Sequence, residues 1–258
     1  MSSSDDDFGT TSRLVRPRVV DETYPYHHRN PWWRLVSAIL YYVVAPLVAC
    51  YIIAYYGIRI RNRAEVRRLH GCYMYGTHSH WVDFALPYLM AFPRRAYLTG
   101  GPTGFSIPGV KHLVAMMGGV PLNTTEAGKA KFRQFLTDAI AAGQVVAMLP
   151  EGHLWPYFTG VRDYPSYAFT YPVRDSNPVL GYAVTYRQRR WLKFRPPCLT
   201  VTISPAIQPE FWQGSPDPKQ KLRDAVHGFM CETVRAQNSF SWIDYTQSYS
   251  AQDGQDAL

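Results

Sequence analysis

The chain has 258 residues, 47% of them apolar and 18% charged. This composition excludes wholesale disorder and fits one sizeable α/β domain with extensions better than two full domains. The net charge of +8 favours anionic partners: anionic lipid, nucleic acid or a phosphate-bearing substrate. The cysteines form no CxxC pair and no zinc spacing. We therefore expect buried apolar side chains in a reducing compartment at Cys50, Cys72, Cys198 and Cys231.

The first segment, residues 1–30, begins MSSSDDDFGTTS and shows no apolar periodicity. We expect it to be a flexible tail. We expect no cleavable secretion signal in it, because the apolar run that follows starts too late and is too long for one.

A membrane anchor is predicted over residues 31–62. Residues 35–58 carry no charge, and their number suits a helix that crosses a hydrocarbon core of about 30 Å. Pro46 would kink or break this helix, so a kinked span and a helical hairpin in one leaflet both fit. The alternative is a buried helix of a globular core. Aromatic residues typical of membrane interfaces flank the run: Trp32, Trp33, Tyr55 and Tyr56.

Arginines lie on both sides of this run, and more of them follow it than precede it. The positive-inside rule then places the following domain on the cytoplasmic face of the cell membrane. Charge on both sides also suits a hairpin whose ends emerge on one face. The following arginines are candidates for holding anionic headgroups: Arg59, Arg61, Arg63, Arg67 and Arg68.

Strand and helix patterns alternate through the next segment, residues 63–236. Apolar β-branched and aromatic runs predict strands at 72–77, 94–100, 144–152, 178–186 and 198–207. Helices are predicted at about 81–92, 107–117, 125–142 and 216–236. The alternation indicates an α/β domain with a central, mostly parallel or mixed sheet flanked by helices. Residues 237–258 are expected to form a C-terminal tail.

Two strand-to-loop junctions carry polar residues suited to chemistry. In YGTHSHWVDF, the side chains of His78 and Asp83 would diverge on a continuous helix. They can converge if His78 lies in the turn before the helix and Asp83 lies within its first turns. An aspartate that accepts from one ring nitrogen fixes the histidine tautomer and raises the basicity of the other nitrogen. In VVAMLPEGH, Glu151 and Gly152 end a buried strand, which suits close approach of a ligand to the backbone.

These segments resemble the glycerolipid acyltransferase family, which includes the lysophosphatidate acyltransferases. HSHWVD resembles its His-x4-Asp motif, and PEGHLW stands where the family usually has Pro-Glu-Gly-Thr-Arg. GGVPLN and NPVLGYAVTY resemble two further blocks. All four occur in the family's order between residues 73 and 206. PEGHLWPYFTGVR also resembles a subgroup found in Gram-positive bacteria.

The resemblance implies roles for particular residues. His78 is the general base on an acceptor hydroxyl, Asp83 orients it, and Glu151 and Gly152 lie near the acceptor. The hydroxyl attacks the thioester of acyl-CoA or acyl-carrier protein. No cofactor, no metal and no covalent acyl-enzyme is implied. The expected acceptor is a lysophospholipid, first of all 1-acyl-glycerol-3-phosphate, which gives phosphatidate; a different lysolipid or a glycolipid is the alternative.

The chain departs from the family pattern at the positions that usually hold the acceptor phosphate. Asn123 stands in place of one arginine, and His153 and Leu154 stand in place of Thr-Arg. Arg162 is a candidate replacement phosphate ligand. The resemblance thus gives Asn123, His153 and Arg162 as further substrate-binding candidates. Other cations that would serve are Lys129, Lys131 and Arg133.

Two other classes of protein are weighed against this interpretation. THSHWVD is similar to a His-x-His-x-Asp-His zinc motif, which makes a metallohydrolase a remote alternative. Asp83 lies one position too late for that motif, however, and Phe84 replaces its last histidine. A nucleic-acid-binding protein would explain the basic charge, but no DNA or RNA motif accompanies it. We expect membrane lipids as partners and no nucleic acid.

Overall fold

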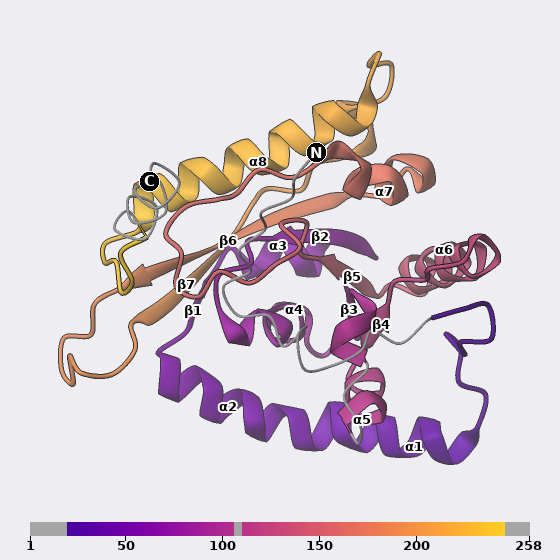
Figure 1. Ribbon diagram of the computed structural model, residues 1–258, viewed down its shortest axis with the longest axis horizontal. Coiled ribbons are helices and arrows are strands. Elements are labelled where there is room, and N and C mark those ends of the chain that lie inside the picture. Colours follow the sequence, from indigo (N-terminus) through magenta and orange to yellow (C-terminus); the bar gives the residue numbers. More distant parts are fainter. Residues whose placement is uncertain (1–19, 106–109, 246–258) are drawn as a thin grey trace, which may run out of the picture.

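A mixed sheet of seven strands forms the centre of the structure, a computed structural model that describes residues 20–105 and 110–245 (Figure 1). Its strand order is β1-β7-β6-β2-β5-β3-β4. The strands are β1 (Arg59–Arg61), β2 (Cys72–Gly76), β3 (Ala96–Gly100), β4 (Gly119–Pro121), β5 (Val145–Met148), β6 (Val179–Arg187) and β7 (Cys198–Ile203).

Neighbouring strands run parallel except at one place. β6 and β7 are antiparallel, with Val184 opposite Val201. β2 lies between β5 and β6 and is parallel to both. The strands β6, β2, β5, β3 and β4 therefore end at the same edge of the sheet. The predicted mixed sheet flanked by helices is confirmed.

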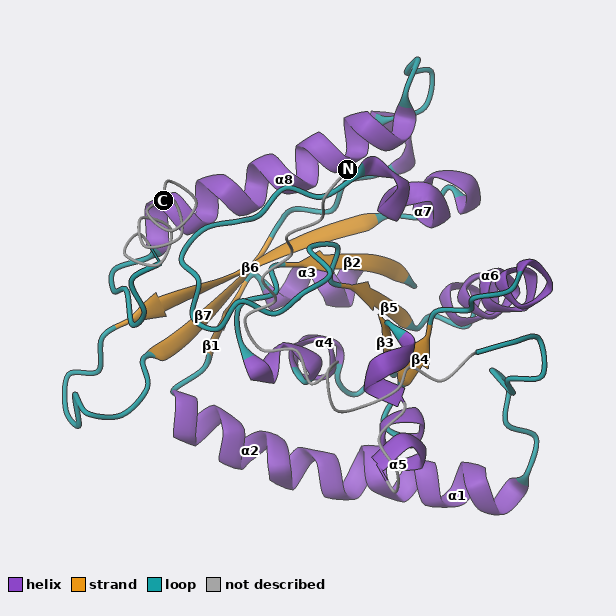
Figure 2. Cartoon of the chain, viewed as in Figure 1, coloured by secondary structure: helices purple, strands orange, loops and turns teal. Residues whose placement is uncertain are grey.

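Helices cover both faces of the sheet (Figures 1 and 2). The α-helices are α1 (Pro31–Ile39), α2 (Ala45–Tyr56), α3 (Arg63–Arg68), α4 (Leu86–Ala91), α5 (Val110–Met116), α6 (Glu126–Ala141), α7 (Thr170–Asp175) and α8 (Pro218–Gln237). A π-helical turn, η2 (Leu40–Val44), joins α1 to α2. The 3₁₀ turns are η3 (Trp81–Phe84), η4 (Pro102–Phe105), η5 (Ser166–Phe169) and η6 (Pro209–Phe211).

The apolar core divides into two layers because successive strand residues point to opposite faces of a sheet. In β2, Met74 faces the layer shared with α2, α3 and α4. Tyr73 and Tyr75 face the layer shared with α6 and α8. Tyr75 also stacks on Phe169, with ring centroids 4.1 Å apart. Such two-sided burial explains why the central strands read as continuous apolar runs.

Several predicted elements are longer than the observed ones. The strand predicted at 198–207 ends at Ile203, and the one at 144–152 ends at Met148. The helix predicted at 81–92 begins as the 3₁₀ turn η3 and becomes α-helical only in α4. Part of the helix predicted at 107–117 lies outside the described residues, and α5 covers the rest.

The predicted anchor is one uninterrupted helix, Pro31–Tyr56, of 26 residues with a mean hydropathy of 2.2. It is long and apolar enough to cross a membrane, and 22% of its most apolar window is buried. Pro46 is accommodated just after the π-helical turn, and the helix does not reverse. The hairpin alternative is therefore wrong, and the low burial does not suit a core helix.

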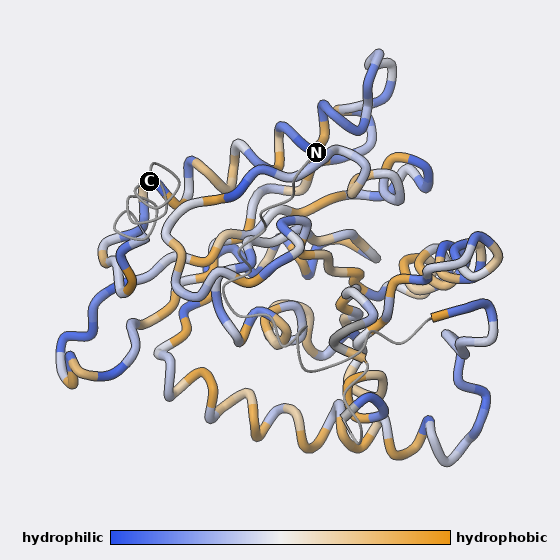
Figure 3. Tube along the Cα trace, viewed as in Figure 1, coloured by the Kyte–Doolittle hydropathy of each residue, from blue (hydrophilic) through white to orange (hydrophobic). Residues whose placement is uncertain are grey.

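One face of this helix nevertheless packs along the domain. Ser37, Tyr41, Ala45 and Ala49 recur every four residues and are buried. The Tyr41 hydroxyl donates to the carbonyl oxygen of Arg94 (3.2 Å) and accepts from the amide of Ala96 (2.7 Å). The helix is thus fixed to the start of β3, and its opposite face is left exposed. Figure 3 shows that most of this helix is hydrophobic.

Both expected tails contribute ordered segments. Residues 20–30 are not a flexible tail: Val20 is buried, and Tyr26 packs against Phe132 with ring centroids 5.7 Å apart. At the other end, Tyr245 stacks on Trp155 at 5.5 Å. Its hydroxyl donates to the carbonyl oxygen of Pro156 at 2.7 Å.

All four cysteines are free thiols. Cys72 and Cys198 are buried, as expected from their apolar character, and Cys231 is partly buried. Cys50 differs, because it lies on the exposed face of α2. The expectation of four buried cysteines is therefore wrong at this position.

Candidate active site

The two predicted junctions meet at one edge of the sheet. β2 and β5 are parallel neighbours, with Tyr75 opposite Met148. His78 follows β2 and Glu151 follows β5 by a few residues, so the two loops emerge side by side. The crevice outside the carboxyl ends of parallel strands is where α/β proteins commonly bind ligands. The Glu151 carboxylate accepts a hydrogen bond from the His78 amide at 3.4 Å.

The side chains of His78 and Asp83 are in contact. The Nδ1 atom of His78 and the Oδ2 atom of Asp83 are 3.1 Å apart. The same oxygen accepts from the amides of Ser79 and His80, both at 2.9 Å. A 3₁₀ turn makes this possible, since it brings Asp83 back over the chain that precedes it.

This arrangement selects one tautomer of His78. A carboxylate can only accept, so Nδ1 carries the proton and Nε2 is left with its lone pair. The His78 side chain keeps 21% of its exposure, whereas that of Asp83 keeps none. Burial raises the pKa of Asp83, and the His78 ring and the two backbone amides oppose that rise. The pair can therefore accept a proton at the exposed side of the ring.

Glu151 is held by an ion pair. The Arg162 Nε atom donates to Glu151 Oε2 at 3.0 Å, and the guanidinium also donates to the carbonyl oxygen of His153. The guanidinium lies 5.0 Å from the centre of the Trp155 ring. Burial raises the pKa of Glu151, and the Arg162 charge opposes it. Arg162 thus fixes the loop that follows β5.

Gly152 has a conformational role in the same loop. Its φ is +79°, and a Cβ there would meet no atom within 4 Å. The glycine is therefore required by the left-handed backbone and not by crowding. His153 comes next and is exposed, and its carbonyl oxygen is the one that accepts from Arg162.

Asn123 is placed in a different environment from the other candidates. It is buried, and its amide nitrogen donates to the carbonyl oxygen of Asp21 (2.8 Å) and to the Tyr26 hydroxyl (3.2 Å). Its side-chain oxygen accepts from the amide of Thr125 at 3.0 Å. The structure thus shows Asn123 joining the N-terminal segment to the start of α6, apart from the contacts that link His78, Asp83 and Glu151.

The three other cationic candidates lie on α6. Lys129 pairs with Glu126 at 2.5 Å. Lys131 donates to the carbonyl oxygen of Glu22 at 2.7 Å. Arg133 lies on the next turn of this helix. These contacts belong to the helix surface and the N-terminal segment.

His80 is enclosed by tyrosines. Its ring lies edge-on to Tyr56 and Tyr157, with centroid distances of 4.8 and 5.0 Å. The Nδ1 atom accepts from the amide of Val82 at 3.1 Å and so caps the 3₁₀ turn. Burial lowers the pKa of His80 to about 4. Tyr56 ends α2, so the apolar helix reaches the loop that carries the His78–Asp83 pair.

No sequence pattern indicated the residues that hold the backbone of the His78–Ser79 loop. The Tyr186 hydroxyl lies 2.8 Å from both the carbonyl and the hydroxyl oxygen of Ser79. The amides of Trp155 and Tyr157 donate to the carbonyl oxygens of His78 (3.3 Å) and Ser79 (2.6 Å). These partners are far apart in sequence, and only strand pairing brings them together.

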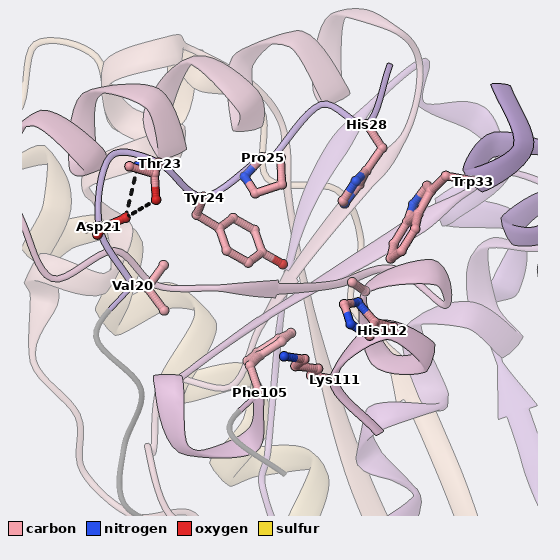
Figure 4. Close-up of a pocket in the computed structure, with 11 residues that line it drawn as sticks. Val20, Asp21, Thr23, Tyr24, Pro25, His28, Trp33, Phe105, Lys111 and His112 are labelled. Carbon is pink, nitrogen blue, oxygen red and sulfur yellow. Dashed lines mark hydrogen bonds between the residues drawn. The ribbon is translucent and has the colours of Figure 1, made fainter. Parts of the chain in front are cut away.

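A separate cavity of about 270 Å³ lies elsewhere on the molecule (Figure 4). It is lined by the N-terminal segment and by α1 and α5, with His28, Trp33, Lys111 and His112 among its walls. None of its lining residues belongs to the His78 and Glu151 loops. Among the described residues, no group of three or more His, Cys, Asp or Glu side chains could hold a metal ion.

The protein is an α/β protein with polar residues gathered at one edge of its sheet. This edge carries the His78–Asp83 pair after β2 and the Glu151 carboxylate after the neighbouring strand β5. Residues 57–195 match the family model described as Acyltransferase. That is more than half of the 258 residues, and the chain belongs to the Acyltransferase family.

Solved structures with a similar fold include that of an acyltransferase. The 1-acyl-sn-glycerophosphate (LPA) acyltransferase, PlsC, from Thermotoga maritima superposes with a TM-score of 0.56 and 14% identity. The match covers 83% of this chain and 91% of that chain. At this identity the likeness establishes the architecture and not the substrate. No curated protein matches the chain.

Proposed function

We propose that this protein transfers a fatty acyl group from a thioester donor to the hydroxyl of a lysophospholipid at a membrane surface. The preferred acceptor is 1-acyl-glycerol-3-phosphate and the product phosphatidate. The contact between His78 Nδ1 and the buried Asp83 carboxylate carries this proposal. Membership of the Acyltransferase family and the fold shared with a protein named for this reaction support it.

In the proposed mechanism His78 is the general base and Asp83 its orienting partner. The Nε2 atom takes the proton of the acceptor hydroxyl as the oxygen attacks the thioester carbonyl. The carbon–sulfur bond then breaks, and the leaving sulfur of coenzyme A or acyl-carrier protein takes the proton from the imidazolium, which restores neutral His78. The Asp83 carboxylate stabilises that imidazolium. Donor and acceptor supply all the reacting atoms, so the step needs no cofactor.

Glu151, Gly152 and His153 are proposed to border the acceptor. They lie in the loop after β5, which contacts the His78 amide. Arg162 is the cation that contacts this loop directly, because it donates hydrogen bonds to the Glu151 carboxylate and to the carbonyl oxygen of His153. It would present its remaining donors to an acceptor phosphate. Asn123 would act at a distance, by holding the N-terminal segment.

A different lysolipid or a glycolipid is the second candidate acceptor. One observation favours it: the Arg162 guanidinium is already shared between Glu151, His153 and Trp155. An acceptor with a smaller charge would need less of that guanidinium than a phosphate monoester does. The reaction at His78 would be the same in either case.

The apolar helix supports a location at a membrane. We propose the cytoplasmic face of the cell membrane, because more arginines follow the apolar run than precede it. Exposed apolar residues beside the pair agree with a lipid substrate: Trp81 and Phe84 of η3 are 56% and 64% exposed. A lipid that reached the His78 ring would pass these side chains.

Acyl transfer to a panel of lysolipids, with acyl-CoA and acyl-carrier protein as donors, tests the proposal. His78→Ala should reduce kcat at least about 100-fold, because the proton acceptor is lost. Full activity in His78→Ala would rule out the mechanism. His70→Ala is a matched control, since it removes an exposed imidazole that precedes β2 and has no proposed part in the site. A strong preference for an uncharged acceptor would favour the second candidate.

A further inference from the structure

Residues 188–196 lie in the loop between β6 and β7, and the proposed mechanism assigns their side chains no role. Its sequence is QRRWLKFRP, with four cations and no acidic residue. Three large apolar side chains lie among them. Trp191 is 77% exposed, Phe194 76% and Leu192 49%. Apolar groups so exposed in a loop cost free energy in water and mark a surface that meets another phase or partner.

This loop is attached to the end of the apolar helix. Arg189 donates to the carbonyl oxygen of Tyr55, and Arg187, the last residue of β6, donates to that of Gly57. The Arg195 guanidinium lies 5.8 Å from the centre of the Tyr55 ring. In Figures 1 and 2 the loop extends outward beyond the end of α2. The exposed face of the helix and the loop therefore form one continuous edge of the molecule.

Two cations of the loop serve no described contact within the protein. Arg190 and Lys193 are both exposed and flank Trp191 and Leu192. Figure 3 shows the apolar tip of the loop between hydrophilic flanks. Aromatic tips that enter the headgroup layer, with arginine and lysine beside them, are the pattern by which proteins bind anionic bilayers.

We propose that residues 188–196 are a second membrane-binding element, which inserts Trp191, Leu192 and Phe194 into the interface of an anionic lipid bilayer. Arg190 and Lys193 pair with lipid phosphates. The helix supplies the first attachment and the loop the second, so the edge that bears α2 and the His80 loop faces the lipid. The inference rests on the proposed action at a membrane, and it adds a lipid-charge requirement that the helix alone does not impose.

The position of the loop can be read with an environment-sensitive fluorophore on the full-length chain. The label is placed at Phe194→Cys in a Cys50→Ser background, because Cys50 is the exposed native thiol. Vesicles of equal parts phosphatidylcholine and phosphatidylglycerol should raise and blue-shift its emission. The same label at Gln213→Cys, an exposed position in the turn before α8, should not respond. Unchanged emission at Phe194→Cys in a chain that floats with the vesicles would overturn the proposal.

A second experiment tests whether binding of the loop requires anionic lipid. Arg190→Gln/Lys193→Gln, in the Phe194→Cys background, should raise the lipid concentration of half-response roughly 30-fold, at about 1 kcal/mol for each cation. Pure phosphatidylcholine vesicles and high salt should weaken the response of the unmodified loop in the same way. An equal response to neutral and anionic vesicles contradicts the proposal. So does a response to duplex DNA in place of vesicles.

The activity assay separates this inference from the proposed function. Trp191→Ser/Leu192→Ser/Phe194→Ser should keep the wild-type rate on acceptor in detergent micelles, because these side chains do not touch the His78 site. Its rate on acceptor embedded in anionic vesicles should fall. Equal rates in vesicles would contradict the loop's role while leaving acyl transfer intact. If the labelled loop inserts but the chain shows no acyl transfer, the proposed function is contradicted and the loop's role in membrane binding is retained.

Discussion

One oxygen of the Asp83 carboxylate accepts three hydrogen bonds, from the His78 ring and the amides of Ser79 and His80. The other oxygen, Oδ1, is buried without a described partner. The position of the imidazole is thus set by a single atom that the backbone holds in place. This makes the tautomer of His78 sensitive to any change in that atom.

Replacing Asp83 with Asn tests this dependence. An amide can present its nitrogen to the ring and favour the wrong tautomer, so we expect kcat to fall about 10²- to 10⁴-fold with little change in acceptor KM. Steady-state kinetics in detergent measure this. Asp138→Asn, at a surface position on α6, is the control. Wild-type kcat in Asp83→Asn would show that the carboxylate does not orient the base.

The buried imidazole of His80 gives the protein a pH-dependent stability. Its pKa is lowered to about 4 in the folded state from an ordinary 6.5. Between these values the unfolded chain binds a proton that the folded chain does not, so stability is complete above about pH 6.5 and is lost as the pH falls towards 4. The loss should reach on the order of 3 kcal/mol.

His80→Asn isolates this contribution, since an asparagine can still accept from the Val82 amide but does not titrate. Unfolding in detergent by denaturant at several pH values would show a smaller acid loss for His80→Asn than for the wild type. Parallel curves for the two proteins would mean that folding does not lower the pKa of His80.

At the scale of elements, the helix Pro31–Tyr56 is joined to β3 through Tyr41. Tyr41→Phe would leave the buried amide of Ala96 without its acceptor, and we expect a loss of about 1–3 kcal/mol in the free energy of unfolding. Tyr42→Phe, next to it on the exposed side, is the matched control and should be nearly neutral. Denaturant unfolding in detergent compares them. Equal stabilities would show that the Tyr41 contact is not retained in solution.

The sequence predicted the long elements and missed the short ones. Five of the strands have apolar runs that periodicity detects. β1 and β4 have three residues each, too few for a pattern, and they exist because β7 and β3 offer free edges. The order of the strands in the sheet could not be predicted from periodicity either, because it depends on pairing between strands that are far apart in sequence.

The candidate site was predictable in part for the same reason. His78 and Asp83 are five residues apart, so local sequence contains their relation. The hydrogen bond between Glu151 and Arg162 spans a loop of irregular backbone, so no regular residue spacing predicts that the two side chains meet. The contacts of Asn123 with residues 20–30 were hidden, because a polar segment without periodicity predicts no packing.

On the scale of the whole molecule, the apolar helix and the domain form one body. The helix buries Ser37, Tyr41, Ala45 and Ala49 against the domain, and the Arg95 guanidinium donates to Ser37 Oγ at 2.6 Å. A helix that crossed the bilayer would carry this charged neighbourhood into hydrocarbon, which is costly. We therefore expect the helix to lie in one leaflet, along the plane of the membrane.

The orientation of the helix can be tested by introducing a cysteine on either side of it. Arg29→Cys and Arg59→Cys, each in a Cys50→Ser background, are exposed positions before and after the helix. A membrane-impermeant maleimide applied to sealed vesicles should label both from the same side. Labelling from opposite sides would show that the helix crosses the bilayer.

Tyr56 forms one wall around His80, and this contact limits how the protein can be shortened for experiments. A water-soluble form made by deleting residues before Gly57 would lose that wall as well as the anchor. The His80 ring, whose Nδ1 atom caps the turn bearing Asp83, would then be hydrated on one side. An inactive truncation of this kind would therefore not show that catalysis requires a bilayer, because the missing tyrosine alone would disturb the turn.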